Sequence, residues 1–378
     1  MTSRIHRRAL LLSGAALALP WATASHAAGV RPRPLAFPTD HGAHPETRTE
    51  WWYVTGSLQA GARLWGFQVT FFRAATGLVT GLGSAQAQAP VQAPASRFDA
   101  SQLLFAHAAL TDLEAGRLRH DQRIARSGFG IAQAQLGDTA ITLRDWQLTR
   151  APSPTDARAS RYTAKVASDT AGFGFELTFD TTQPVLLQGD AGLSKKGPAD
   201  ADTSRYYSEP QLAARGSLTL EGKRIEVQGR AWLDHEWSDS FIPLQAVGWD
   251  WIGMNLDDGS ALTAFRLRRA DGSSVYAGGS FRAPGQPMQN FGPDELRFTP
   301  GRLWASTATR ARYPVQWTVA TSAGTFRVNA LLDNQELDSR ASAGAVYWEG
   351  LSELLDEKGT RVGRGYLEMT GYAAALRL

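Results

Sequence analysis

The chain has 378 residues, with 39 Lys and Arg, 36 Asp and Glu, 12 Trp and no cysteine. The formal net charge of the whole chain is +3, and Arg4, Arg7 and Arg8 lie in an N-terminal stretch without acids, so the remaining chain has a formal charge of 3 − 3 = 0. This balance disfavours nucleic acid as a partner, because phosphate binding needs clustered Lys and Arg. The lack of cysteine excludes disulfides, thiolate metal sites, thiol catalysis and a lipoprotein anchor.

Residues 1–27 have the layout of a bacterial export signal. A basic start is followed by an apolar run over 9–19 that is too short to span a bilayer, and small residues favour cleavage after Ala27. The pair Arg7-Arg8 indicates twin-arginine export, and an ordinary export signal is the alternative. We therefore expect a periplasmic or secreted protein without a transmembrane segment in the mature chain.

Beyond a proline-punctuated lead-in at residues 28–43, the sequence predicts almost only strands, because runs rich in aromatic and β-branched residues alternate with Gly- and Pro-bearing turns. The predicted strands cover 50–58, 64–72, 103–112, 140–148, 161–168, 172–180, 214–220, 223–233, 247–256, 261–268, 274–282, 315–320, 325–332, 346–351 and 365–371. Short helical pieces are expected only near 99–103, and long connections at 80–95, 187–204 and 283–294. The pattern predicts an all-β protein with two barrel-like domains in tandem.

The first segment with candidate site residues begins at Glu50. Strand alternation places Trp51 and Tyr53 on one face and Glu50 on the other. We expect these three residues to contact a ligand, although a strand-start carboxylate bonded to a loop is an equal alternative for Glu50. The nearby His41 and His44 lack a third ligand at a diagnostic spacing, so no metal site is predicted.

The second segment holds three consecutive ionisable residues, Asp234-His235-Glu236, between two tryptophans. An Asp beside a His can set its tautomer and pKa, which suits general acid–base catalysis. These three residues are therefore candidate catalytic groups, and Trp237 is a candidate ligand contact. The alternative is a polar network that ties the two domains together.

The third segment contains Asp250 between Trp249 and Trp251. The tryptophans share one strand face, while Asp250 shares the other face with apolar residues. Burial would raise the pKa of this carboxyl group and make it a proton donor, unless it pairs with Arg266. His107 lies on an apolar strand face as well; it is either a core histidine or a ligand contact.

These segments resemble the AttH/CrtC family, which comprises secreted proteins labelled as AttH hydrolases and the carotenoid 1,2-hydratases. The resemblance covers essentially the whole chain after the export signal. The matching motifs are Phe37-Pro38-x-Asp40-x-Gly42-x-His44-Pro45, Glu50-Trp51-Trp52-Tyr53-Val54-Thr55-Gly56, Tyr206-Tyr207-Ser208-Glu209-Pro210, Trp232-Leu233-Asp234-His235-Glu236-Trp237, Gly248-Trp249-Asp250-Trp251, Tyr347-Trp348-Glu349-Gly350 and Gly365-Tyr366-Leu367-Glu368-Met369-Thr370-Gly371-Tyr372.

The resemblance implies two lipocalin-like β-barrels, spanning 44–229 and 230–378, with an apolar ligand pocket near their interface. In the hydratase branch, water adds across a terminal double bond of an acyclic carotenoid through a carbocation, without a cofactor. The important His and Trp of the family correspond to His235 and Trp237. An essential acid of the family is a further candidate role for Asp250.

Three functions remain open from the sequence. The export signal and the Asp-His-Glu-Trp-Ser form resemble the AttH branch, whose members are thought to accompany ABC transporters. We therefore expect a protein that binds an apolar isoprenoid or lipid-like molecule, with an envelope ABC transporter as a partner. The alternatives are a cofactor-independent enzyme of the hydratase or hydrolase type and a structural envelope protein without a small ligand. A buried acid with a raised pKa distinguishes the enzyme from the binder.

Overall fold

The structure is a computed structural model that describes residues 30, 32–76, 100–154, 156 and 159–376. The expected export signal and the expected connection at 80–95 lie outside these residues. The described part is almost entirely β-structure, which confirms the predicted fold class. Its two helices are single 3₁₀ turns, η1 (Thr39–His41) and η2 (Pro293–Glu295), and neither approaches the length and apolarity needed to cross a membrane.

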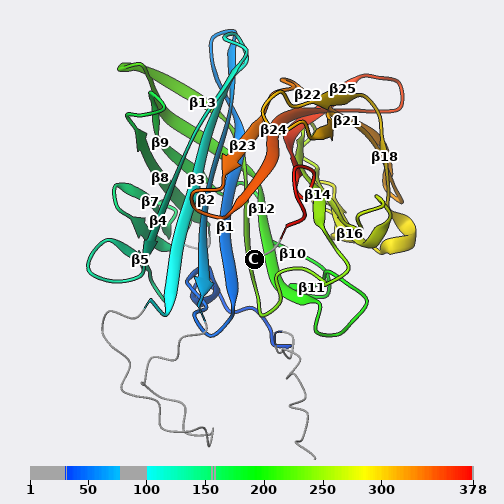
Figure 1. The fold of residues 1–378 in the computed structure, drawn as a ribbon, viewed down its shortest axis with the longest axis horizontal. Coiled ribbons are helices and arrows are strands. Elements are labelled where there is room, and N and C mark those ends of the chain that lie inside the picture. Colours follow the sequence, from blue (N-terminus) through cyan, green and yellow to red (C-terminus); the bar gives the residue numbers. More distant parts are fainter. Residues whose placement is uncertain (1–29, 31, 77–99, 155, 157–158, 377–378) are drawn as a thin grey trace, which may run out of the picture.

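The first sheet forms a nearly closed antiparallel barrel (Figure 1). Along the sheet the strand order is β4-β3-β2-β1-β13-β12-β9-β8-β7-β6-β5, and β10 and β11 each pair with β12. These strands are β1 (Thr49–Ala60), β2 (Arg63–Ala75), β3 (Gln102–Asp112), β4 (Arg117–Arg126), β5 (Ala132–Ala134), β6 (Ala140–Leu143), β7 (Trp146–Pro152), β8 (Ser160–Ser168), β9 (Phe173–Asp180), β10 (Leu186–Leu187), β11 (Leu193–Lys195), β12 (Thr203–Leu220) and β13 (Lys223–Ser238). Alternate residues such as Val54, Phe67 and Leu177 fill the barrel interior.

The second sheet packs around a separate core that includes Ile252, Trp317 and Trp348. Its path is β17-β16-β15-β14-β25-β24-β22-β21-β18, with β23 paired to β24, and a small two-stranded sheet joins β19 to β20. These strands are β14 (Gly248–Leu256), β15 (Ala261–Arg268), β16 (Ser274–Arg282), β17 (Gln289–Phe291), β18 (Arg297–Pro300), β19 (Leu303–Ala305), β20 (Arg312–Pro314), β21 (Gln316–Thr321), β22 (Gly324–Ala330), β23 (Glu336–Ser339), β24 (Ala345–Leu355) and β25 (Arg361–Met369).

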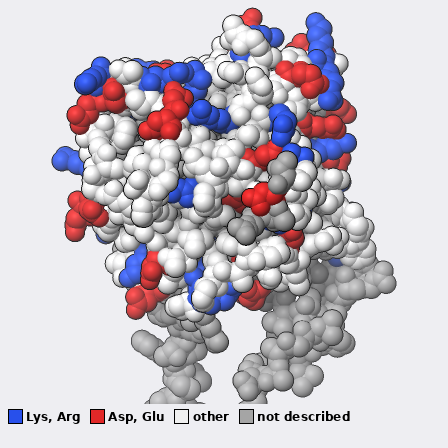
Figure 2. Space-filling view, turned by 180° about the vertical axis from the view of Figure 1, so that it is seen from behind, with Lys and Arg blue, Asp and Glu red and all other residues white. Residues whose placement is uncertain are grey.

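The two sheets lie side by side, and β23 and β24 of the second sheet cross the outer face of the barrel (Figure 1). The barrel strands that contact the second sheet most are β1 and β13, and β2, β4 and β12 also reach it. Because side chains alternate along a strand, each of these strands has one face toward the barrel interior and one toward the second sheet. Figure 2 shows acidic and basic side chains interspersed on the face seen from behind, and this face has no broad patch made of basic side chains alone.

Several boundaries differ from the sequence-based expectations. The change of sheet lies between Ser238 and Gly248 rather than at residue 229, because β13 stays paired with β1 as far as Thr49↔Ser238. The predicted strand 140–148 is two strands, because Arg144 adopts a positive φ of 58° in a turn. The helical pieces expected near 99–103 are wrong, since β3 begins at Gln102.

Candidate active site

An aromatic cleft of about 360 Å³ lies between the outer face of the barrel and the second sheet. Trp51 and Tyr53 of β1 face the cleft from the barrel, and Trp249 and Trp251 of β14 face it from the second sheet. Tyr53 and Trp251 meet edge to face, with ring centroids 5.4 Å apart. The structure therefore brings together four aromatic residues that the sequence nominated as ligand contacts.

Besides Glu50, whose oxygens bond residues inside the barrel, four carboxyl groups line this largely apolar cleft. Asp234 and Glu236 come from β13, Glu349 from β24 and Glu368 from β25. Among the ion pairs of the described residues, only one joins a cation to any of the four, and it involves Glu236. Three acids thus face an apolar space without a cationic partner in that part of the chain, which favours their protonated forms.

Asp234 is held in place by three hydrogen-bond donors. Its carboxyl oxygens accept from Ser208 Oγ at 2.6 Å, Trp232 Nε1 at 2.7 Å and Tyr206 Oη at 2.9 Å. Burial outweighs these hydrogen bonds and raises the pKa of Asp234 to about 7. The group is therefore rigidly oriented and can gain or lose a proton near neutral pH.

Glu349 and Glu368 lie directly opposite each other on neighbouring strands, so their side chains share one face. Burial raises the pKa of Glu368 to about 7. Burial and the charge of Glu368 raise the pKa of Glu349 well above its usual range. Because two adjacent carboxyl groups resist double ionisation, the pair retains a proton at neutral pH and can donate it.

Lys196 provides the cationic partner of Glu236. It follows β11, is 9% exposed, and places Nζ 2.5 Å from Glu236 Oε1. The same ammonium group lies 4.5 Å from the centroid of the Trp51 ring. Among these four carboxyl groups, Glu236 is therefore the one that has a cationic partner in the described part of the chain.

His107 lines the cleft and links the two sheets. Its Nδ1 is 2.7 Å from Tyr347 Oη and its Nε2 is 2.9 Å from Ser342 Oγ. Ser342 itself donates to Gln122, so it accepts from His107 Nε2–H, and Tyr347 donates to Nδ1. Burial lowers the pKa of His107 to about 3, so the ring is neutral. His107 lines the cleft as predicted for a ligand contact, but both of its ring nitrogens are already hydrogen-bonded.

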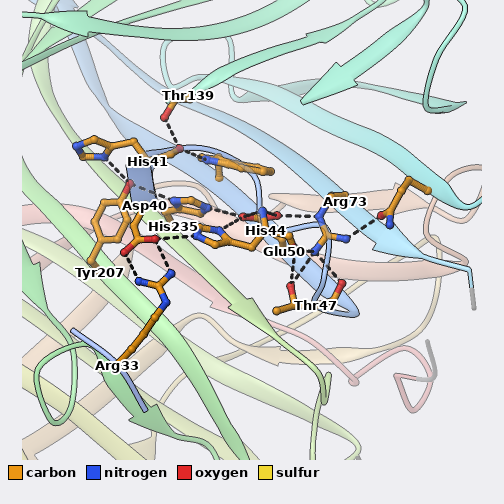
Figure 3. A network of polar contacts seen from close by, with 12 residues as sticks. Arg33, Asp40, His41, His44, Thr47, Glu50, Arg73, Thr139, Tyr207 and His235 are labelled. Atoms are coloured by element: carbon orange, nitrogen blue, oxygen red, sulfur yellow. Dashed lines mark hydrogen bonds and ion pairs between the residues drawn. The ribbon is translucent and has the colours of Figure 1, made fainter. Parts of the chain in front are cut away.

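His235 and Trp237 point into the barrel and not into the cleft, because they alternate with Asp234 and Glu236 along β13. His235 Nε2 lies 2.9 Å from Glu50 Oε1, and His44 Nδ1 lies 2.8 Å from the same oxygen (Figure 3). Arg73 donates to Glu50 Oε2 at 2.7 Å. The sequence grouped Asp234, His235 and Glu236 into one site, and the structure separates the histidine from the two acids.

The barrel network also holds the lead-in segment. Asp40 bonds both His44 and Arg33, and His41 bonds Tyr207 Oη at 2.8 Å (Figure 3). Although burial opposes both charges, hydrogen bonds between Glu50 and the two histidines lower the pKa of Glu50, and Glu50 and Asp40 raise that of His44.

One oxygen of Glu50, one nitrogen of His44 and one nitrogen of His235 lie within 4.8 Å of one another, a spacing that a metal ion could use. The three side chains already hydrogen-bond one another, and the guanidinium of Arg73 adds positive charge beside them. Glu50 also reaches the edge of the cleft, but its oxygens are committed to this network. We therefore regard the group as a closed polar core.

Asp250 lies outside the cleft lining and is fully buried on the other face of β14. Arg266 Nε donates to it at 2.7 Å and Tyr372 Oη at 2.8 Å. The structure thus shows the alternative in which Asp250 pairs with Arg266, which removes it as a free proton donor.

The sequence interpretation missed Glu349, Glu368 and Lys196 as site residues. A signal for the two acids was present, because Tyr347-x-Glu349 and Tyr366-x-Glu368 each place a carboxyl group on the same strand face as a tyrosine. Lys196 lies in a connection without strand periodicity, and no pattern in the chain marks it.

A family model described as AttH-like matches residues 28–372. The chain belongs to the AttH-like family. The crystal structure of an AttH protein from Nitrosomonas europaea is 42% identical to this AttH-like chain, with a TM-score of 0.79, and the match covers 91% of this chain and 98% of that chain. The expected family membership is therefore confirmed.

Two comparisons involve a hydratase. The crystal structure of kievitone hydratase from Nectria haematococca has the same fold, with 15% identity, a TM-score of 0.66 and coverage of 90% of the AttH-like chain and 94% of that chain. Kievitone hydratase of Fusarium solani subsp. phaseoli is 25% identical over 179 residues, which are 46% of this chain and about half (49%) of that relative. The structural match shows the shared fold, and the sequence match spans about half the length of the curated relative.

Proposed function

We propose that this protein is a cofactor-independent enzyme that adds water to, or removes water from, a carbon–carbon double bond of an apolar, isoprenoid- or lipid-like molecule bound in the cleft. The observation that carries the proposal is the Glu349–Glu368 pair, because it places a retained proton in an aromatic cleft. A carrier protein needs an apolar cleft but gains nothing from uncompensated acids that disfavour burial.

In the proposed reaction, the acid pair donates a proton to one carbon of the double bond, and the π electrons form the new C–H bond. The adjacent carbon becomes a cation, which the faces of Trp51, Trp249 and Trp251 stabilise. Water then attacks this carbon, a C–O bond forms, and the surplus proton of the water passes to a second carboxyl group of the cleft. Return of that proton to the acid pair completes the cycle.

The kievitone hydratase similarity makes hydration the version that we propose first, and an acyclic carotenoid and kievitone are the first compounds to test. Location in the periplasm, twin-arginine export and cooperation with an ABC transporter stay predictions from the sequence.

The test is incubation of the protein with these two compounds and mass spectrometry of the products. We expect a gain of one water with wild type. Glu368→Gln and Glu349→Gln should lower turnover by about 100-fold or more, as expected for loss of a general acid. Glu353→Gln is the matched control, because it makes the same change on β24 outside the cleft lining. Turnover that survives both cleft substitutions would overturn the proposed role of the pair.

A further inference from the structure

The four carboxyl groups of the cleft differ in their electrostatic surroundings. An ionised carboxylate in an apolar space is costly unless a positive charge lies close by. Lys196 Nζ lies 2.5 Å from Glu236 Oε1, whereas Asp234, Glu349 and Glu368 form no ion pair with any described residue. The cleft thus combines one carboxylate that is paired with a cation and three carboxyl groups that have no cationic partner among the described residues.

The groups that face Glu236 come from four elements. Lys196 approaches from the segment after β11, Tyr206 is its register partner on β12, Asp234 precedes it on the same face of β13, and Glu368 lies on β25. The hydroxyl group of Tyr206 donates a hydrogen bond to Asp234. Burial raises the pKa of both Asp234 and Glu368 to about 7, so both carboxyl groups are mostly neutral below that pH. Of the groups named here, Lys196 is then the one that carries a full charge beside Glu236.

Glu236 is also free to contact a small molecule. Apart from the ion pair, Glu236 Oε1 accepts no hydrogen bond from the described residues, although it is buried. Glu236 lines the cleft from the barrel side and the Glu349–Glu368 pair lines it from the second sheet, so a water molecule held by the Glu236 carboxylate would lie between them. An acid on one wall and a base on the other can serve the two carbons of a double bond to which water adds.

We propose that Glu236 is the base that takes the proton from the attacking water, and that Lys196 is a positioning residue that keeps Glu236 ionised. The inference rests on the proposed function and names the proton acceptor that it leaves open. As the C–O bond forms, one O–H bond of the water breaks and its proton passes to Glu236. The proton then returns to the acid pair, so no co-reactant is consumed.

The segment that carries Lys196 is braced for this role. Lys196 N–H donates to Asp202 O at 2.7 Å, and Ala199 N–H donates to the Asp202 carboxylate at 3.2 Å. The ring of Trp51 supports the ammonium group from the adjacent strand. These contacts fix the ammonium group over Glu236, although the lysine stem is long.

The experiment is a carboxyl carbon NMR titration of protein labelled at its glutamates, with the Glu236 signal assigned from Glu236→Gln. In Lys196→Met the midpoint of the Glu236 titration should rise by at least about 1 pH unit, because an opposite charge within hydrogen-bonding distance is removed. Lys196→Arg should restore the wild-type midpoint. Lys195→Met is the matched control, since this neighbouring lysine is exposed and lies 3.9 Å from Asp200.

The titration needs no substrate, so its outcome is separate from that of the turnover test. An unchanged Glu236 midpoint in Lys196→Met overturns the role of Lys196, whatever the protein hydrates. Where turnover is measured, the acidic limb of its pH profile should move with the Glu236 midpoint in Lys196→Met and return in Lys196→Arg. A limb that stays in place while the midpoint moves overturns the role of Glu236 as the base.

Discussion

Glu349 and Glu368 keep a proton under conditions in which a carboxyl group in water is ionised. Their apolar surroundings and their direct opposition on β24 and β25 both disfavour a second negative charge. The proton is therefore retained by the fold itself, and folding is coupled to its binding. This coupling is measurable in the protein without any ligand.

Glu368 should make the protein less stable as the pH rises. Its pKa is raised from 4.5 to about 7, so between these values the folded state binds more protons than the unfolded state. Stability from this group is fully present below pH 4.5 and is lost as the pH approaches about 7, by at most about 1.4 kcal/mol per pH unit for one proton. We expect Glu368→Gln to flatten the curve of unfolding free energy between these values, measured by urea denaturation. An unchanged slope in this variant would contradict the raised pKa.

At the level of single residues, the sequence predicted the cleft aromatics better than the chemistry. Alternation along β1 and β14 was enough to place Trp51, Tyr53, Trp249 and Trp251 on cleft-facing sides. The role of Asp250 could not be resolved, because the partner Arg266 is on another strand and only the register of β14 with β15 brings them together. Ion pairs between paired strands depend on that register, which one sequence does not specify.

Among the elements, β1, β13 and the lead-in segment form one polar unit inside the barrel. Glu50 lies at its centre and bonds His44, His235 and Arg73 (Figure 3). Removing a buried carboxylate that has several partners leaves those partners without a counter-charge. This polar unit should therefore contribute strongly to the stability of the barrel, although its carboxylate oxygens and ring nitrogens bond one another and do not face the cleft.

Glu50→Gln should lower the free energy of unfolding by about 3–5 kcal/mol, the usual cost of breaking a buried ion pair. Glu226→Gln on β13 is the control, because Glu226 is exposed and, among the described residues, forms an ion pair with Arg224 alone, so its loss should cost less than about 1 kcal/mol. Both variants are compared by urea denaturation. Equal stability of the two variants would show that the barrel network contributes nothing.

The sequence predicted strands correctly where apolar residues alternate clearly with polar ones, and it missed strands where this alternation is absent. β4 was missed because Arg117–Arg126 is rich in arginine and lies at an edge of the barrel sheet, with no fully buried residue. The beginning of β12 was missed because Tyr206, Ser208 and Glu209 do not form an apolar run. Tyr206 and Ser208 donate to Asp234 of β13, and Glu209 accepts from Tyr162 of β8. These contacts become visible only in the folded chain.

For the whole molecule, the cleft exists only because two sheets are held against each other. The barrel contributes Asp234 and Glu236, and the second sheet contributes Glu349 and Glu368. Interfaces such as the His107–Tyr347 hydrogen bond fix the distance between the walls. The sequence predicted a pocket near the interface through its family resemblance, but the division of the acids between the walls required the structure.

This distribution of charge predicts which ligands the cleft accepts. Above neutral pH, Asp234 and Glu368, whose pKa values are raised to about 7, become ionised and oppose a negatively charged ligand. At about pH 8 we expect geranylgeraniol to bind about tenfold more tightly than geranylgeranoic acid, equal to about 1.4 kcal/mol. Quenching of tryptophan fluorescence reports the binding, since Trp51, Trp249 and Trp251 line the cleft.

Glu368→Gln should reduce the difference in affinity between geranylgeraniol and geranylgeranoic acid, and Glu353→Gln should leave that difference unchanged. Tighter binding of the carboxylic acid by wild type would mean that the cleft is organised for anions.

The alternation of side chains along β13 limits which insertions and deletions this protein can tolerate during evolution. Consecutive residues of that strand serve two unrelated tasks, since Asp234 and Glu236 belong to the cleft while His235 and Trp237 belong to the barrel interior. Inserting or deleting one residue would exchange the two sets, sending acids into the barrel and a histidine into the cleft. Point substitutions can tune either task alone, but a change of length within β13 damages both at once. We therefore expect homologues to vary in length at the loops around β13 and not within it.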